Sequence, residues 1–270
     1  MESKGIKMEP REIITQDVRH NIALLVEYDG TPFCGWQSQK NGNSIQDALK
    51  KAIYDLTGEK VKLHGCSRTD AGVHATGHVS NFLSATKIPI DKIPIAMNSH
   101  LPMEIAVKKA AYQEESFHAR FDAIGKQYRY SIWNEATRSA LLRNRTYHVP
   151  RPIDIDLMRQ AAEKLVGTKD FCAFMASGSE VKSTIRTLHR IQILEETPQI
   201  HMIFYGDGFL YNMVRILAGT MYYVGTGKIS IDDLDGIIDG KDRTRAGKTL
   251  PSCGLTLEKV FYEKELFCQR

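Results

Sequence analysis

Strand-like and helix-like segments alternate along the chain in two stretches of similar length and order, and this pattern limits the folds open to it. Strands are predicted at 22–26, 61–66, 77–84, 104–112, 125–133, 184–194, 199–205 and 255–262. Helices that recur between such strands are typical of an α/β (α+β) sandwich built from two related halves. We place the halves at residues 20–124 and 125–270, after a polar leader over residues 1–19. No linker separates them, so the pattern leaves open whether their sheets merge.

Helices are predicted where apolar residues recur every three to four positions. The first begins at Ser44, which forms a capping pair with Asp47, and it ends at Gly58. The other helices are predicted at 91–99, from a cap at Asp154 to Gly167, at 210–221, and from a cap at Ser230.

The composition is that of a globular protein that can build a sizeable core. The chain has 270 residues, of which 42% are hydrophobic and 25% are charged. Its net charge is +4 and its pI is near 8.7. This mild basic excess permits a nucleic-acid partner without requiring one.

The cysteines and the apolar segments indicate the compartment. Five scattered cysteines without a Cys-x-x-Cys pair argue against a disulfide framework or a zinc site and favour a reducing cytoplasm. Residues 1–20 are polar, so no secretory signal is expected. The most apolar window, 209–224, is interrupted by Asn212 and Arg215, which predicts a buried helix and no membrane span. We therefore expect a soluble cytoplasmic protein without metal or cofactor.

Residues 67–75 contain the most informative carboxylate, Asp70, two residues after Arg68 and two before Gly72. An extended backbone would place Arg68 and Asp70 on one face, where the arginine would favour a charged carboxylate. An ionised, positioned carboxylate suits nucleophilic attack on a nucleoside. However, Asp-Ala-Gly is also typical of a turn whose aspartate bonds its own backbone. The spacing alone leaves both interpretations open.

Another segment, residues 116–130, combines aromatic and basic residues. Arg120 precedes a predicted strand in which Lys126, Tyr128 and Tyr130 share one face. A cation beside aromatic rings suits an RNA base that must be stacked and a phosphate that must be neutralised. The alternative is a half-buried strand that is rich in aromatic residues because these favour strands.

Arg215 lies on an otherwise apolar predicted helix, one position beyond the stripe of Met213, Val214 and Leu217. Burying an unpaired charge costs several kcal/mol. Arg215 therefore either emerges at the edge of the helix or pairs with a carboxylate.

Three further patterns carry weaker signals. The loop 28–37 reads as a rigid turn around a packed Trp36. Residues 246–249 faintly resemble a phosphate loop, but Asp242 stands where that motif requires glycine. The basic clusters, which would be solvated faces or phosphate contacts, are Arg138, Arg143 and Arg145, and Lys241, Arg243, Arg245 and Lys248.

Five separated segments resemble the TruA family of tRNA pseudouridine synthases, in the order that the family has them. They are residues 28–30, 68–74, 117–120, 126–130 and 212–215, and the resemblance spans about residues 20 to 265. Segment 68–74 is highly specific, whereas the others are individually weak. Ser67 departs from the pattern, since many members have glycine there.

The resemblance implies a pseudouridine synthase fold, in which two related ferredoxin-like halves share a mixed central sheet flanked by helices, with a cleft between the halves. It also implies a homodimer bridged by one tRNA. It implies that Asp70, Arg68 and Arg215 are catalytic, with Arg215 paired to Asp70 from the other half, and that Tyr128 lies against the target uracil. Arg120 and Lys126 complete the predicted substrate site.

The predicted activity is isomerisation of uridine to pseudouridine at positions thirty-eight to forty of the tRNA anticodon stem-loop. A flipped-out base would meet Asp70, which attacks either the uracil ring or the ribose, and Arg68 would fill the space that the base leaves. Tyr128 is also a candidate for moving a proton. One alternative is an RNA-binding module without chemistry, and a second is a phosphate-handling nucleotide enzyme that depends on magnesium or a nucleoside triphosphate.

Overall fold

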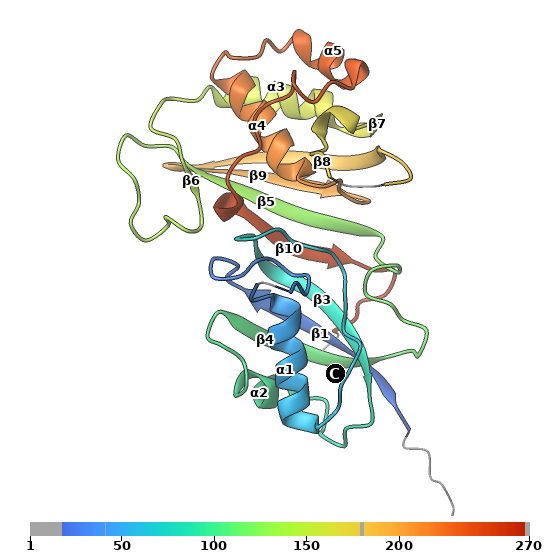
Figure 1. Cartoon of the computed structure of the whole chain (residues 1–270). Helices are drawn as coiled ribbons and strands as arrows, with labels where there is room; N and C mark the ends of the chain where they lie inside the picture. Colours follow the sequence, from blue (N-terminus) through green and yellow to red (C-terminus); the bar gives the residue numbers. More distant parts are fainter. Residues whose placement is uncertain (1–17, 41, 179–180, 268–270) are drawn as a thin grey trace, which may run out of the picture.

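Ten strands of the described residues join one mixed sheet that both halves share (Figure 1). The computed structural model describes residues 18–40, 42–178 and 181–267, so most of the predicted leader lies outside the described residues. The strands are β1 (His20–Tyr28), β2 (His64–Gly65), β3 (His74–Ser84), β4 (Ile105–Gln113), β5 (Gly125–Trp133), β6 (Tyr147–His148), β7 (Gly167–Asp170), β8 (Ile185–Glu196), β9 (Gln199–Gly206) and β10 (Leu255–Phe261). The predicted fold class is confirmed, and the two sheets do merge.

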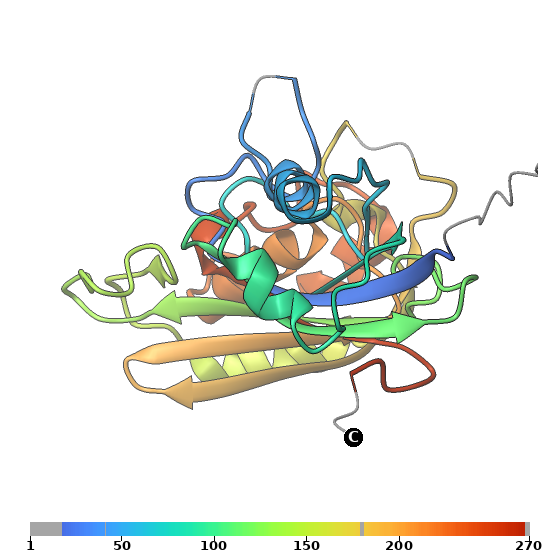
Figure 2. The same ribbon diagram turned by 90° about the horizontal axis from the view of Figure 1, so that it is seen from below.

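The described residues form five helices, and side-chain caps mark where two of them begin. They are α1 (Ile45–Thr57), α2 (Ile93–Asn98), α3 (Ile155–Leu165), α4 (Met213–Gly225) and α5 (Asp233–Gly240), with single 3₁₀ turns at Cys172–Phe174 and Ser252–Gly254. Ser44 accepts a hydrogen bond from the Asp47 amide, as predicted, and Asp154 accepts one from the Leu157 amide. Figure 2 shows α1 and α2 on one face of the first half.

Each half has the ferredoxin-like order of elements. The chain of the first half runs β1-α1-β2-β3-α2-β4, and its four strands form an antiparallel sheet in the order β4-β1-β3-β2. The second half runs β5-α3-β8-β9-α4-β10, and its strands repeat the arrangement in the order β10-β5-β9-β8. Strand β7 is added at the edge beside β8. The halves join where β3 pairs in parallel with β10. The predicted relation between the two halves is therefore present, whereas the boundary at residue 124 stays a prediction.

Some element boundaries differ from the predicted ones. The strand expected at 61–66 is limited to His64–Gly65, and the Leu63 carbonyl instead accepts a hydrogen bond from the Gln46 side chain. The strand expected at 77–84 begins earlier, at His74. Gly167, expected to end a helix, has φ of 110° and turns the chain directly into β7, which was not predicted.

The predicted cap at Ser230 is also wrong. Helix α5 begins at Asp233, and the Ser230 hydroxyl accepts a hydrogen bond from the Asp232 amide in the turn that precedes it.

Helix α4 is almost completely buried, which explains its apolar composition. Met213, Ile216, Leu217 and Met221 are fully shielded from solvent. None of the described helices combines the length and the apolar character that crossing a bilayer requires.

Candidate active site

A large cleft opens between the two halves, with a volume of about 1190 Å³. The first half contributes the segment between β2 and β3, and the second contributes the residues that precede α4. Five cationic side chains and the Asp70 carboxylate line it in the described part of the chain. The cations are Lys62, Arg68, Arg120, Lys126 and Arg186. The cleft is therefore suited to a polyanion.

Asp70 lies on a loop that is held on both sides by buried contacts. Its neighbour Thr69 is buried, and the Thr69 carbonyl accepts a hydrogen bond of 3.0 Å from the Trp36 amide. The Thr69 hydroxyl lies 2.9 Å from the hydroxyl of buried Tyr28. The Val73 amide donates to the Asp70 carbonyl, which closes the turn. Trp36 is thus a packed structural residue, as predicted, and it fixes the backbone that carries Asp70.

An ion pair joins Asp70 to Arg215 across the cleft. Arg215 Nη1 lies 3.1 Å from Asp70 Oδ2, and the two side chains are 17% and 30% exposed. The same guanidinium donates to the Leu250 carbonyl and to Asn212 Oδ1, at 2.7 and 2.6 Å. Arg215 therefore has the carboxylate partner that the resemblance implied. Among the described residues no side-chain hydrogen bond reaches Asp70 Oδ1, so this oxygen faces the cleft unpaired.

Arg68 does not occupy the place that an extended backbone would give it. The segment from Cys66 to Val73 is an irregular loop, and Arg68 is exposed on it. Among the described residues Asp70 forms its ion pair with Arg215 and none with Arg68. Arg68 still lines the cleft, where its side chain is free to meet a ligand.

Tyr128 forms the floor of the cleft on β5. It is 6% exposed, its hydroxyl lies 3.2 Å from Ser67 Oγ, and its ring meets Phe209 edge-on. Burial raises the pKa of Tyr128, and the charge of Asp70 contributes in the same direction. The side chain is therefore a neutral phenol at physiological pH, suited to packing and to donating a hydrogen bond.

The other predicted substrate residues also line the cleft. Burial lowers the pKa of Lys126, and the positive charges of Arg120 and Arg186 lower it further. Arg120 is exposed and lies 5.8 Å from the centroid of the Phe121 ring. Both cations therefore stand where a phosphate could be neutralised.

Several residues of this site were not predicted from the sequence. Ser67, Arg186 and Phe209 line the cleft, and Ser67 contacts Tyr128 directly. The departure from glycine at Ser67 was visible in the sequence, but its contact depends on strand pairing. Arg186 and Phe209 carried no local signal.

Comparison with known proteins identifies the family. A family model described as tRNA pseudouridine synthase matches residues 24–122 and 161–263. A protein of Acetivibrio thermocellus named tRNA pseudouridine synthase A is 48% identical over 242 residues, which are 90% of this chain and 99% of that protein. Proteins of the same name from Thermoanaerobacter sp. (strain X514) and Clostridium acetobutylicum are 49% and 46% identical, with the same coverage.

The chain belongs to the TruA family of tRNA pseudouridine synthases. It is thus an enzyme, an isomerase, and the resemblance seen in its motifs is confirmed. Among solved structures, a chain of a Cbf5–Nop10–Gar1 complex matches with a TM-score of 0.43 and 12% identity, over 90% of this chain and 50% of that one.

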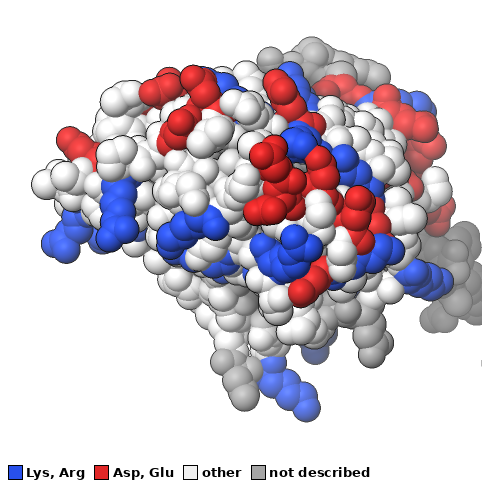
Figure 3. Space-filling view, turned by 90° about the horizontal axis from the view of Figure 1, so that it is seen from above, with Lys and Arg blue, Asp and Glu red and all other residues white. Residues whose placement is uncertain are grey.

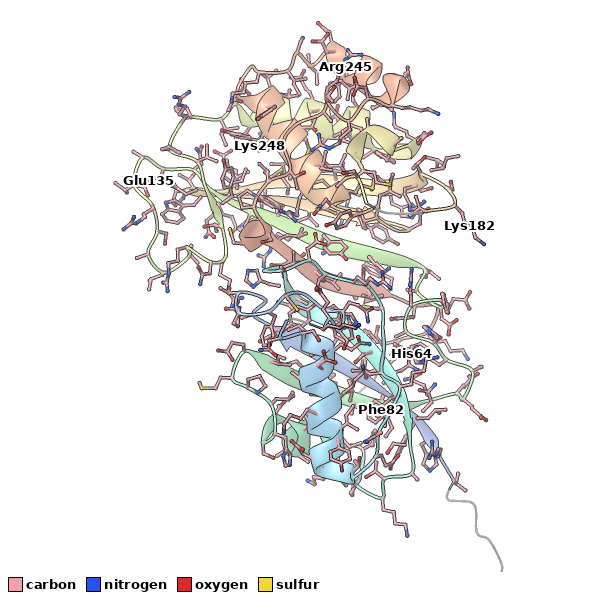
Figure 4. All side chains as sticks on the ribbon, viewed as in Figure 1. His64, Phe82, Glu135, Lys182, Arg245 and Lys248 are labelled. Atoms are coloured by element: carbon pink, nitrogen blue, oxygen red, sulfur yellow. The ribbon has the colours of Figure 1, made fainter. Side chains whose placement is uncertain are left out.

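The basic cluster at 241–248 mainly holds its own half of this pseudouridine synthase together. Arg245 donates to the Gly236 carbonyl within α5, and Lys248 donates to the Tyr147 hydroxyl; Figure 4 labels both cations. Figure 3 shows the end of the molecule formed by the second half, where acidic and basic side chains are interspersed. The cations that line the cleft are therefore better placed for a polyanionic substrate.

Proposed function

We propose that this enzyme converts uridine to pseudouridine in the anticodon stem-loop of tRNA, at positions thirty-eight to forty, with Asp70 as the nucleophile. The observation that carries the proposal is the carboxylate held by Arg215 inside a cationic cleft. The names of the relatives support tRNA as the substrate class.

The reaction breaks the bond between the ribose C1′ and the uracil N1 and forms one between C1′ and C5. The C5 proton passes to solvent, N1 gains a proton, and the bond to the Asp70 carboxylate breaks again, so that no atom is gained or lost overall. Asp70 Oδ1 attacks either the uracil ring or C1′, because Oδ2 is occupied by Arg215. Arg215 keeps the carboxylate oriented, and the fixed loop around Thr69 prevents it from turning away.

The target base must leave its stack before Asp70 can reach it, at a cost of a few kcal/mol. Tyr128 provides a flat, buried surface against which the extruded uracil packs. Arg68 is exposed at the cleft and fills the space that the base leaves in the RNA, while Arg120 and Lys126 neutralise neighbouring phosphates.

Cys66 is the buried thiol beside this loop, and its environment argues against a role as nucleophile. It is fully shielded, and burial raises its pKa to about 11. Its thiol is therefore protonated and unreachable, which favours Asp70 as the group that attacks.

The test uses unmodified tRNA that carries tritium at C5 of its uracils, without added cofactor. We expect the protein to release tritium. Asp70→Asn, which keeps the shape and an oxygen for Arg215, should lose release by more than 1000-fold while retaining its Kd for tRNA. Asp91→Asn, an exposed carboxylate on the first half, serves as the matched control and should behave like the unchanged protein. Normal turnover by Asp70→Asn would contradict the assignment.

Two rival activities make different predictions in the same assay. A passive RNA-binding module would bind tRNA without tritium release, and membership of an isomerase family already argues against it. A nucleotide enzyme would depend on magnesium or a nucleoside triphosphate, so release that persists in a chelator would exclude it.

We further propose that the protein works as a homodimer bridged by one tRNA, an assembly that the family resemblance supports. Sedimentation velocity of the purified protein should give twice the chain mass of 30.5 kDa, and a monomer that is fully active would contradict the proposal.

A further inference from the structure

Three aromatic rings form a connected surface at the rim of the cleft, and the proposed mechanism does not use them. The Phe121 ring lies 4.3 Å from that of His118, and the His118 ring lies 4.4 Å from that of His64, measured between centroids. All three residues line the same cleft as Asp70, and Figure 4 labels His64. We call His64, His118 and Phe121 the aromatic shelf.

The Phe121 side chain is 74% exposed, although the turn that carries it is rigid. Ala119 is fully buried in this turn, where its amide donates to Asn81 Oδ1 on β3 and its carbonyl accepts from the Tyr262 hydroxyl. His118 is fixed as well, since its Nδ1 accepts from the Arg120 amide. The exposed ring therefore belongs to a preformed surface, which reduces the entropy that a ligand must overcome.

Positive charge surrounds the aromatic shelf. The Arg120 guanidinium lies 5.8 Å from the Phe121 centroid, and Lys62, Lys126 and Arg186 line the same cleft. An apolar peptide would gain little from these cations. Exposed rings beside phosphate-binding side chains are instead the arrangement by which proteins hold unstacked nucleobases.

We propose that the aromatic shelf stacks the nucleobase next to the target uridine once that uridine has left the helix. This inference rests on the proposed function. Extruding a nucleotide removes the stacking partner of its neighbour, and the aromatic shelf replaces the partner that was lost. In the proposed function Tyr128 packs against the extruded uracil itself, so Tyr128 and the aromatic shelf hold different bases.

The test measures binding in the Asp70→Asn background, where we expect turnover to be more than 1000-fold slower. The probes are anticodon stem-loop RNAs with 2-aminopurine on the 5′ or on the 3′ side of the target uridine. We expect binding to quench one of the two probes. Phe121→Ala should abolish this quenching and weaken binding by about 10-fold, a free-energy difference of about 1.4 kcal/mol. Phe121→Trp should retain both properties.

Ile95→Ala is the matched control, because Ile95 is 72% exposed on α2 and does not line the cleft. It should bind and quench like its parent, and thermal unfolding should show that each variant is folded. Unchanged quenching and affinity in Phe121→Ala would overturn the proposal and indicate a different occupant for the aromatic shelf. The proposed function fails separately, if the unchanged protein releases no tritium from tRNA.

Discussion

At the scale of single residues, the geometry around Asp70 depends on the planar guanidinium of Arg215, whose N–H groups point in fixed directions. Arg215 serves Asp70, Asn212 and the Leu250 carbonyl at once. A lysine has the charge but lacks the planar fork, so it cannot satisfy all three acceptors in fixed directions. Loss of hydrogen bonds to a charged group costs about 1.5–3 kcal/mol.

Arg215→Lys should therefore lower the turnover number by about 10- to 100-fold while leaving the Kd for tRNA nearly unchanged. Tritium release under saturating tRNA measures the first quantity and filter binding the second. Arg159→Lys, a substitution at a half-exposed arginine on α3, is the control and should be silent. A variant as active as its parent would show that charge alone suffices at this position.

His78 sets a second property at this scale, the response of the fold to acid. It is fully buried and stacked on Trp36, with ring centroids 3.7 Å apart. Its Nε2 lies 3.1 Å from the Ser67 carbonyl, and its Nδ1 is buried without a partner among the described residues. Burial lowers the pKa of His78 to about 3, and nearby Lys126 opposes its protonation further.

When the pH lies between the pKa of about 3 in the folded protein and the ordinary value of 6.5, His78 is protonated in the unfolded chain but neutral in the folded chain. The contribution of neutral His78 to the free energy of unfolding is therefore fully present above about pH 6.5 and is lost as the pH falls toward 3. His78→Phe, which keeps a ring against Trp36, should flatten the decline of the urea midpoint between pH 7.5 and 5.5. His100→Phe, at an exposed position, should leave the decline as it is. An equal slope in His78→Phe and its parent would contradict the assignment.

At the scale of elements, residues 29–40 position the backbone of the Asp70 loop. Gly35 has φ of 105°, and a Cβ there would lie 2.4 Å from the Thr69 carbonyl oxygen and 3.0 Å from the Asp70 carbonyl carbon. Glycine is needed at this position both for its conformation and for the close approach of the two backbones.

Gly35→Ala should lower the free energy of unfolding by about 1–3 kcal/mol and should also reduce turnover, because the Asp70 loop must shift. Gly58→Ala is a matched control: Gly58 also has positive φ, at 74°, but a Cβ there meets nothing within 4 Å. It should destabilise the protein by a smaller amount and leave turnover intact. Tritium release and urea unfolding compare the two. If both variants kept full turnover, residues 29–40 would not be needed to position the Asp70 loop.

At the scale of the whole molecule, the joined sheet brings cations from both halves to one cleft. Lys62 and Arg68 come from the first half, and Lys126 and Arg186 from the second. Phosphate contacts of this kind make binding depend on salt, because each releases counterions from the RNA.

Arg186→Ala should weaken tRNA binding at every salt concentration, and it should reduce the slope of log Kobs against log salt by about 1. Lys92→Ala removes an exposed cation outside the cleft and should leave the slope unchanged. Titrations of tRNA binding between low and moderate salt measure both slopes. A slope that Arg186→Ala does not alter would show that Arg186 makes no phosphate contact.

The sequence by itself determined the elements whose signals are local. The caps at Ser44 and Asp154, the buried stripe of α4 and the repeated order of strands and helices all follow from residues close together in the chain. The motif around Asp70 and its resemblance to a known family were equally readable, and the family was confirmed.

Tertiary structure decided which partners these residues meet, although the family resemblance had already implied the pair of Arg215 and Asp70. The segment around Arg68 is a loop and not a strand, because its backbone bonds to the turn at Trp36, far from it in sequence. Arg215 reaches Asp70 across 145 positions of chain, in a fold whose two halves are joined by the parallel pairing of β3 with β10. Contacts of that range depend on the packing of the whole sheet, which no local pattern of residues records.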